Sequence, residues 1–100
     1  MCGRFSRTHG EDELQQRFGY DKQGLELKPR YNLAPGQDAG VVILDDRKRL
    51  RLMRWGLVPA WAKDAKAGFK AINARAETLN QKPMFKELLK KNRCLILADG

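Results

Sequence analysis

The stretch Val41-Val42-Ile43-Leu44-Asp45-Asp46-Arg47-Lys48-Arg49-Leu50-Arg51-Leu52 decides the fold. It begins with an apolar run rich in β-branched residues, continues with four polar residues, and ends where leucines alternate with arginines. Two strand-like runs joined by a short polar turn are typical of a β-hairpin. The sequence therefore predicts an antiparallel hairpin whose second strand ends near Trp55-Gly56.

A short helix is predicted before this hairpin. Thr8 and Glu11 have the spacing of a capping box, in which each side chain satisfies an amide at the start of a helix. Leu14 and Phe18 follow at i, i+4 and share one helical face. We expect the helix to begin at Glu11 and to end at Gly19.

A second helix and a strand are predicted after the hairpin. Pro83 suits the first turn of a helix, and Lys90-Lys91 suit its last turn. We expect an apolar stripe of this helix to be buried: Met84, Phe85, Leu88 and Leu89. Residues 93–98 read as a buried strand, whereas residues 21–40, with two prolines and three glycines, read as an irregular connection.

These elements predict an α+β fold with a mainly antiparallel sheet. The chain stops at Asp99-Gly100, directly after the apolar run Leu95 to Ala98. A natural domain seldom ends on a buried strand followed by a turn dipeptide. We therefore expect residues 1–100 to be the N-terminal portion of one larger domain.

Charge and cysteine content narrow the class of function. The chain carries 20 Lys+Arg against 12 Asp+Glu, a formal charge of +8, which favours binding to polyanions such as nucleic acid. No segment approaches the roughly 20 apolar residues of a membrane helix, and no signal peptide follows Met1. Two cysteines and one histidine give neither a disulfide framework nor zinc-ligand spacing. We expect a cytoplasmic, nucleoid-associated protein without a metal site, and a monomer as the simplest state.

Cys2 is the first candidate for chemistry. Once Met1 is removed, Cys2 carries a thiol and a free α-amine on adjacent carbons, and the pKa of an α-amine lies well below that of a lysine side chain. The amine can condense with an aldehyde to an imine, and the thiol can close onto the imine carbon to give a thiazolidine. Gly3 permits close approach of a partner, and Arg4 adds a guanidinium beside the amine.

Two further segments are ambiguous on their residues alone. The alternation of polar and small residues over 71–78 fits either an edge strand or a site in which Asn73 orients a reacting group and Arg75 holds a phosphate. Trp55 and Trp61 fit either a core plug or a platform for an unstacked base. We assign no role to His9, which we expect to be solvated, and we expect Cys94 to be a buried core thiol.

Together, five blocks in order resemble the SOS-response-associated peptidase (SRAP) family over the first half of its domain. The blocks are Met1 to Phe5, Arg30 to Pro35, Trp55 to Trp61, Ile72 to Thr78 and Cys94 to Gly100. The resemblance implies a barrel-like β core with flanking helices. It also implies covalent capture of ring-opened abasic sites in single-stranded DNA, which protects the lesion, and an autopeptidase activity that exposes the cysteine. The resemblance implies that neither a metal nor an organic cofactor is used.

The resemblance assigns roles to individual residues. Cys2 is the nucleophile, and Asn73 positions the sugar or the cysteine amine. Arg4 and Arg75 match positions that contact DNA phosphates beside the lesion. Three more residues match blocks that shape the pocket floor or a DNA-bending wedge: Trp55, Asn32 and Pro35.

The chain departs from the family pattern at its end, and alternatives remain. The family's catalytic Glu and His lie beyond the equivalent of Gly100, so we expect the 100-residue chain to show reduced or no cross-linking and doubtful autonomous stability. The first alternative is a basic module that binds single-stranded DNA without covalent chemistry. The second is a cysteine peptidase that acts on other proteins, for which His9 is a poor candidate base.

Overall fold

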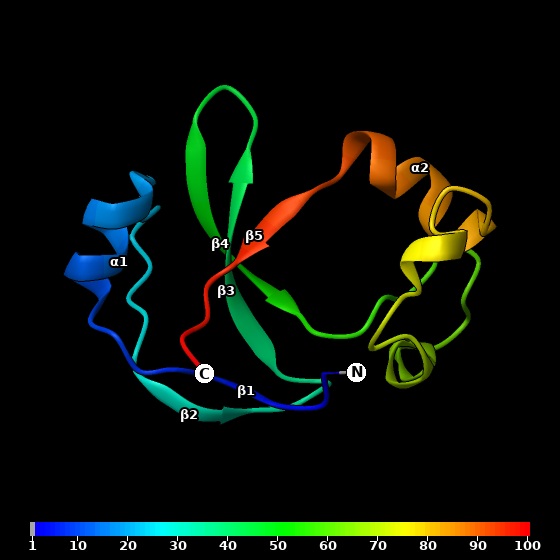
Figure 1. Cartoon of the computed structure of the whole chain (residues 1–100), viewed down its shortest axis with the longest axis horizontal. Helices are drawn as coiled ribbons and strands as arrows, with labels where there is room; N and C mark the ends of the chain where they lie inside the picture. The colour runs from blue at the N-terminus through cyan, green and yellow to red at the C-terminus, as the bar shows by residue number, and fades with distance from the viewer. Residues whose placement is uncertain (1) are drawn as a thin grey trace.

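A computed structural model describes residues 2–100 as an α+β fold (Figure 1). Its elements follow in the order β1 (Phe5–Arg7), α1 (Glu11–Phe18), β2 (Arg30–Leu33), β3 (Asp38–Leu44), β4 (Lys48–Arg54), the 3-10 helices η1 (Ala65–Lys70) and η2 (Ala76–Thr78), α2 (Pro83–Lys91) and β5 (Cys94–Ile96). Every strand pairing is antiparallel apart from one isolated bridge. The predicted α+β class is therefore confirmed.

The predicted hairpin forms the centre of the molecule. β3 and β4 pair in continuous register from Leu44 opposite Lys48 to Asp38 opposite Arg54. β5 pairs with the other edge of β3, which gives the strand order β4-β3-β5. The hairpin prediction is confirmed, although β3 begins at Asp38, within the segment that we expected to be irregular.

A second sheet was not predicted. β1 and β2 form a two-stranded antiparallel sheet in which Phe5 lies opposite Leu33 and Arg7 opposite Arg30, with an irregularity between the two pairs. The expectation of an irregular chain over 21–40 is wrong at β2, because a four-residue strand without clear alternation gives little local signal. Over residues 2–100 the two sheets stay separate, and no closed barrel is formed.

The central strand β3 has covered residues on both of its faces. Val42 packs into the core cluster with residues of α1, of the 20–27 segment, of β4 and of the chain end: Leu14, Tyr20, Leu27, Leu50 and Leu97. Ala39 and Val41, which point to the opposite face, line a cleft instead. The sheet thus separates a core beneath α1 from an open apolar face, and α1 and α2 lie on opposite sides of the hairpin in Figure 1.

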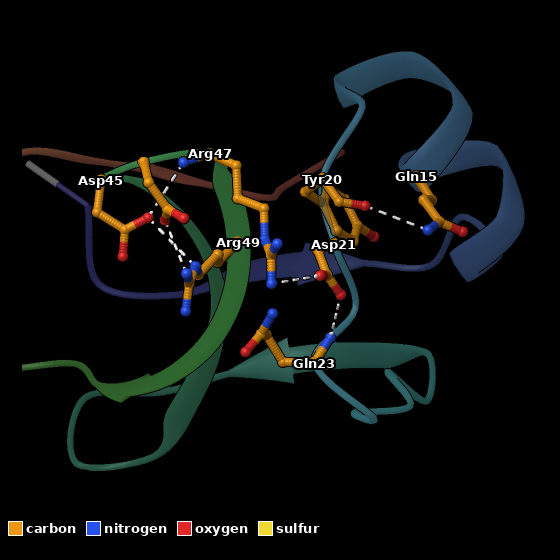
Figure 2. A network of polar contacts seen from close by, with 8 residues as sticks. Gln15, Tyr20, Asp21, Gln23, Asp45, Arg47 and Arg49 are labelled. Atoms are coloured by element: carbon orange, nitrogen blue, oxygen red, sulfur yellow. Dashed lines mark hydrogen bonds and ion pairs between the residues drawn. The ribbon is translucent and has the colours of Figure 1, made fainter.

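Polar contacts tie the hairpin turn to the segment after α1 (Figure 2). The Arg49 guanidinium contacts Asp45 at 3.2 Å and Asp46 at 2.7 Å, and Arg47 contacts Asp21 at 3.3 Å. The backbone of Asp21 also donates to the carbonyl of Lys48 at 2.9 Å and accepts from the amide of Leu50 at 2.8 Å. These bonds fix the 19–27 segment over the core.

The ends of α1 show one correction and one confirmation. Gly10 is the N-cap and offers no side-chain cap, while the Thr8 hydroxyl donates to Asp99 instead. The predicted capping box is therefore wrong, because a carboxylate distant in sequence competes successfully for Thr8. Gly19 ends the helix as predicted, with a φ of 64° that suits glycine.

The C-terminal elements are less buried than predicted. α2 begins at Pro83 as expected, but none of its residues is buried, and Met84, Phe85 and Leu88 are only half-covered. Cys94, Leu95 and Ile96 of β5 are all exposed, so Cys94 is not a core thiol, and only Leu97 enters the core. The reason is that β5 is an edge strand with a single neighbour.

Candidate functional site

Cys2 and Asn73 are brought together from distant parts of the sequence. The Nδ2 amide of Asn73 donates to the carbonyl oxygen of Cys2 at 2.9 Å. Both side chains are exposed, and the Cys2 thiol makes one long contact of 3.5 Å with the carbonyl of Arg4. Asn73 lies in a segment without regular secondary structure before η2, so the edge strand that the 71–78 alternation allowed is not formed. The expected removal of Met1 concerns a residue outside those that the structure describes.

Arg4 is held next to this pair by β2. Its Nη1 donates to the Asn32 side-chain oxygen at 3.2 Å, and both residues are exposed. The antiparallel pairing of Phe5 with Leu33 makes this contact possible, because it brings the Arg4 side chain within reach of Asn32 on the neighbouring strand. Asn32 therefore orients the guanidinium of a residue that lies two positions after Cys2.

Trp55 forms part of the wall between Cys2 and the hairpin. Its Nε1 donates to the carbonyl of Ile72 at 2.8 Å, and its ring lies 5.4 Å from that of Phe5 in a tilted arrangement. The Trp55 carbonyl accepts from the amide of Gly36 at 2.9 Å, which places the turn that contains Pro35 beside the same wall. Trp55 thus holds the residue before Asn73 against β1.

These residues border a cleft of about 700 Å³, here called the Cys2 cleft. Cys2 and Asn73 line it together with Phe5, Trp55 and Cys94. The remaining lining residues are mainly apolar: Ala39, Val41, Met53, Arg54, Gly56, Leu57, Val58, Ile72, Ile96 and Ala98. Partial burial of its sulfur raises the pKa of the Cys94 thiol, although the residue as a whole is exposed.

Asn73 also borders a second, basic surface. A hollow of about 640 Å³ is lined by Asn73, the exposed Trp61 and three lysines, Lys63, Lys66 and Lys70. Arg75 lines an adjoining hollow with Asn73 and Trp61, and it is not among the residues of the Cys2 cleft. Trp61 is 65 % exposed, so it is not a core plug.

His9 is exposed, as expected, but it also makes a contact that the sequence did not predict. Its Nδ1 lies 2.8 Å from Asp99, whose carboxylate also accepts from the hydroxyls of Ser6 and Thr8. The hydrogen bond to Asp99 raises the pKa of His9, and bonds from His9 above all hold the pKa of Asp99 well below its usual range. This Asp99 clasp joins the end of the chain to β1, the strand that follows Cys2.

The sequence reasoning missed part of the site. Phe5 and the cleft walls Met53, Val58 and Ile96 were not singled out, although all four line the Cys2 cleft. The apolar face of β3 could have pointed to Met53 and Ile96, which lie opposite Ala39 and Val41 in its partner strands and share that face. Among the described residues no group of three or more His, Cys, Asp or Glu side chains is arranged to hold a metal ion. No described helix is long and apolar enough to span a membrane.

Comparison with known proteins adds a family match to this geometry. The sequence profile described as SOS response associated peptidase (SRAP) matches residues 1–100. The abasic site processing protein YoqW of Bacillus subtilis (strain 168) is 48% identical over all of this chain and 46% of its own length. The abasic site processing protein HMCES of Gallus gallus is 37% identical over all of this chain and 37% of its own. The chain thus spans less than half the length of these relatives.

A solved structure supports the fold. A crystal structure of a protein from Bacteroides thetaiotaomicron superposes with a TM-score of 0.76 at 23% identity. The match covers 95% of this chain and 45% of that one. The similarity extends to the arrangement of the strands and helices, and at this identity it speaks for the fold alone.

Proposed function

The chain belongs to the SOS response associated peptidase (SRAP) family, and from that premise we propose that it processes abasic sites by capturing them covalently through Cys2. The substrate is the ring-opened deoxyribose of an abasic site in single-stranded DNA, whose C1′ is an aldehyde. The observation that carries the proposal is the contact between Asn73 and Cys2 at the mouth of a cleft. The relatives named as abasic site processing proteins support the choice of substrate.

The proposed reaction needs no cofactor. With Met1 removed, the α-amine of Cys2 adds to C1′, and loss of one water gives an imine. The thiol then adds across the C=N bond: sulfur bonds to C1′ and the thiol proton ends on nitrogen. The product is a thiazolidine whose mass equals that of the protein plus the DNA less one water.

Asn73 would act as the group that orients the nucleophile. Its amide bonds the Cys2 carbonyl, so it restricts the backbone torsions that aim the α-amine and thiol. Holding a nucleophile in a reactive geometry lowers the entropic part of a barrier. Asn73 also borders the basic hollow, which would bring the lesion and its flanking phosphates to one residue.

The DNA backbone would follow the basic side of Asn73. Lys63, Lys66 and Lys70 line one hollow and Arg75 the next, with Trp61 common to both. Proteins that bind single-stranded nucleic acid commonly combine exposed cationic side chains with exposed aromatic rings, because the cations attract phosphates and the rings stack on bases. Arg4, held by Asn32, would reach a phosphate on the other side of Cys2.

Intact-mass measurement tests the proposal directly. The protein is expressed from its complete reading frame without an N-terminal tag, and removal of Met1 is verified by mass. It is then mixed with a single-stranded oligonucleotide that carries one abasic site and measured under denaturing conditions. We expect the mass of protein plus DNA less water, and its absence in Cys2→Ala.

A matched control tests whether the α-amine and the thiol must belong to the same residue. A form with one extra glycine before Cys2 keeps the thiol and an α-amine but places them on different residues, so it should give no thiazolidine. Free masses alone from the unmodified, folded protein would favour the non-covalent binding module instead. A peptidase that cleaves other proteins needs a base near the thiol, and His9, the histidine among residues 1–100, bonds Asp99 and is not a lining residue of the Cys2 cleft.

A further inference from the structure

The indole N–H of Trp55 is bonded to the protein itself. A tryptophan side chain has one hydrogen-bond donor and no acceptor. That donor lies 2.8 Å from the carbonyl oxygen of Ile72. The family resemblance assigns Trp55 to a pocket floor or a DNA-bending wedge, but a donor used in this way is not free for a phosphate or a sugar hydroxyl. The bond acts instead on the peptide that joins Ile72 to Asn73.

We propose that Trp55 is a positioning residue for capture at Cys2 and that it acts through Asn73. The inference rests on the proposed function. The Ile72 carbonyl and the Asn73 nitrogen belong to one planar peptide unit, so a bond to the oxygen fixes the plane from which Asn73 extends. The Asn73 amide then donates to the carbonyl of Cys2 at 2.9 Å. Two hydrogen bonds in series therefore connect the indole to the backbone of the nucleophile.

The ring of Trp55 also contacts the strand that follows Cys2. The ring centroids of Phe5 and Trp55 lie 5.4 Å apart with 51° between the planes, a favourable arrangement for an aromatic pair. Phe5 is three residues after Cys2. Trp55 thus touches the segment that carries the nucleophile and the segment that carries Asn73. Such support from both sides restricts the Cys2–Asn73 geometry more tightly than their own hydrogen bond does.

The backbone of Trp55 is held by the segment that leads into β3. Its amide donates to the carbonyl of Gln37 at 2.9 Å, and its carbonyl accepts from the amide of Gly36 at 2.9 Å. None of these bonds requires the Cys2 cleft to be open. Trp55 is therefore fixed independently of the two segments that it positions.

Cross-linking kinetics of two variants at position 55 test the inference. The Met1-free protein from the complete reading frame reacts with a single-stranded abasic oligonucleotide under single-turnover conditions, over a range of DNA concentrations. Trp55→Phe removes the N–H and keeps a ring beside Phe5. Incorporation of 3-benzothienylalanine at position 55 alone keeps the bicyclic shape and replaces the N–H by sulfur, so it tests the donor even where Trp55→Phe does not fold.

Both variants should lower the limiting rate of cross-linking by about tenfold, because the reactive geometry is less well held. The final extent of reaction and the half-saturating DNA concentration should stay unchanged. Tyr20→Phe is the matched control, since it also removes one hydrogen-bonding group from an aromatic side chain. Tyr20 belongs to the core cluster and is not a lining residue of the Cys2 cleft, so this variant should keep the unmodified rate.

A double-mutant cycle distinguishes positioning from a general loss of structure. If Trp55 acts through Asn73, Trp55→Phe should lower the rate of the Asn73→Ala variant by less than about twofold, whereas a purely structural role lowers it equally in both backgrounds. The unmodified rate in both position-55 variants, or the full tenfold loss in the Asn73→Ala background, overturns the positioning role while capture stands. No adduct from the unmodified protein overturns the proposed function, and the role of Trp55 with it.

Discussion

The side-chain amide of Asn73 donates a 2.9 Å hydrogen bond to the carbonyl oxygen of Cys2, across 71 positions of sequence. The contact depends on the wall next to it, because Trp55 holds the carbonyl of Ile72 at 2.8 Å. The Leu57 amide also donates to the carbonyl of Ala71 at 3.0 Å. The end of the hairpin therefore sets the position of Asn73, and Asn73 sets the position of Cys2.

Removal of this amide should slow capture more than it weakens DNA binding. Asn73→Ala deletes the bond that orients Cys2, and loss of orientation typically lowers a rate by tenfold to about a hundredfold. We expect that loss in the single-turnover cross-linking rate, with non-covalent affinity changed by less than about threefold. Asn80→Ala, at an exposed position for which the structure describes no side-chain hydrogen bond, is the control. Cross-linking by Asn73→Ala at the unmodified rate would remove Asn73 from the proposed mechanism.

Gly56 is the second position on which the site geometry depends. Its φ is 116°, and an added Cβ would lie 2.5 Å from the carbonyl oxygen of Gly68. Gly56→Ala should cost about 1–3 kcal/mol of stability, which lowers Tm by roughly 4–8 °C per kcal/mol in a domain of this size. Thermal unfolding followed by circular dichroism measures the change. Gly3→Ala, with no atom within 4 Å of the added Cβ, should leave Tm nearly unchanged. Equal Tm values for the two variants would show that a Cβ at position 56 causes no strain.

The elements that the sequence predicts correctly depend on neighbours in sequence. The hairpin follows from alternation across a short turn, the end of α1 from Gly19, and the start of α2 from Pro83. β1 and β2 were missed because Phe5 meets Leu33 only through long-range pairing, and each strand is too short to show a period. The capping box failed for the same reason, since Thr8 bonds Asp99, 91 positions away.

In the candidate site, too, features set by neighbours in sequence were predicted, whereas features set by long-range packing were not. The chemistry of Cys2 is readable from its place after Met1, and the family blocks single out Asn73 and Arg4. The apolar walls are not readable, because they arise where the uncovered face of β3 meets β5 and the 55–58 segment. Burial was overestimated for Cys94 and for α2, because apolar residues were assigned to a core that does not cover them among residues 2–100.

The Asp99 clasp should make stability depend on pH through His9. Its hydrogen bond to Asp99, aided by Glu13 and opposed by Arg17, raises the pKa of His9. A raised histidine pKa adds stability that is complete below the unfolded value of ~6.5 and is lost as pH rises through the folded value. The lowered pKa of Asp99 acts oppositely: its contribution is present above ~3.9 and is lost as pH falls toward the folded value.

The difference in Tm between the unmodified protein and His9→Gln isolates the histidine. Glutamine can still donate to Asp99 but does not titrate, so the difference should be largest near about pH 5–6 and shrink toward about pH 9. Thermal melts in matched buffers provide the measurement, and other titrating groups cancel in the difference. A difference in Tm that stays constant or grows with pH would show that protonated His9 does not stabilise the folded protein through its contact with Asp99.

The basic hollow should contribute to DNA affinity in a salt-dependent way. If Lys66 contacts a phosphate, Lys66→Gln removes one released counterion, and the slope of log affinity against log salt should become shallower by about 0.7 for single-stranded DNA. Fluorescence anisotropy with an oligonucleotide that lacks an abasic site measures this slope without covalent capture. Lys28→Gln removes the same charge from an exposed residue that does not line the hollow, so net charge alone predicts equal effects in the two variants. A shallower slope confined to Lys66→Gln places the strand beside Trp61 and Asn73, whereas equal slopes would mean that the hollow does not follow the DNA backbone.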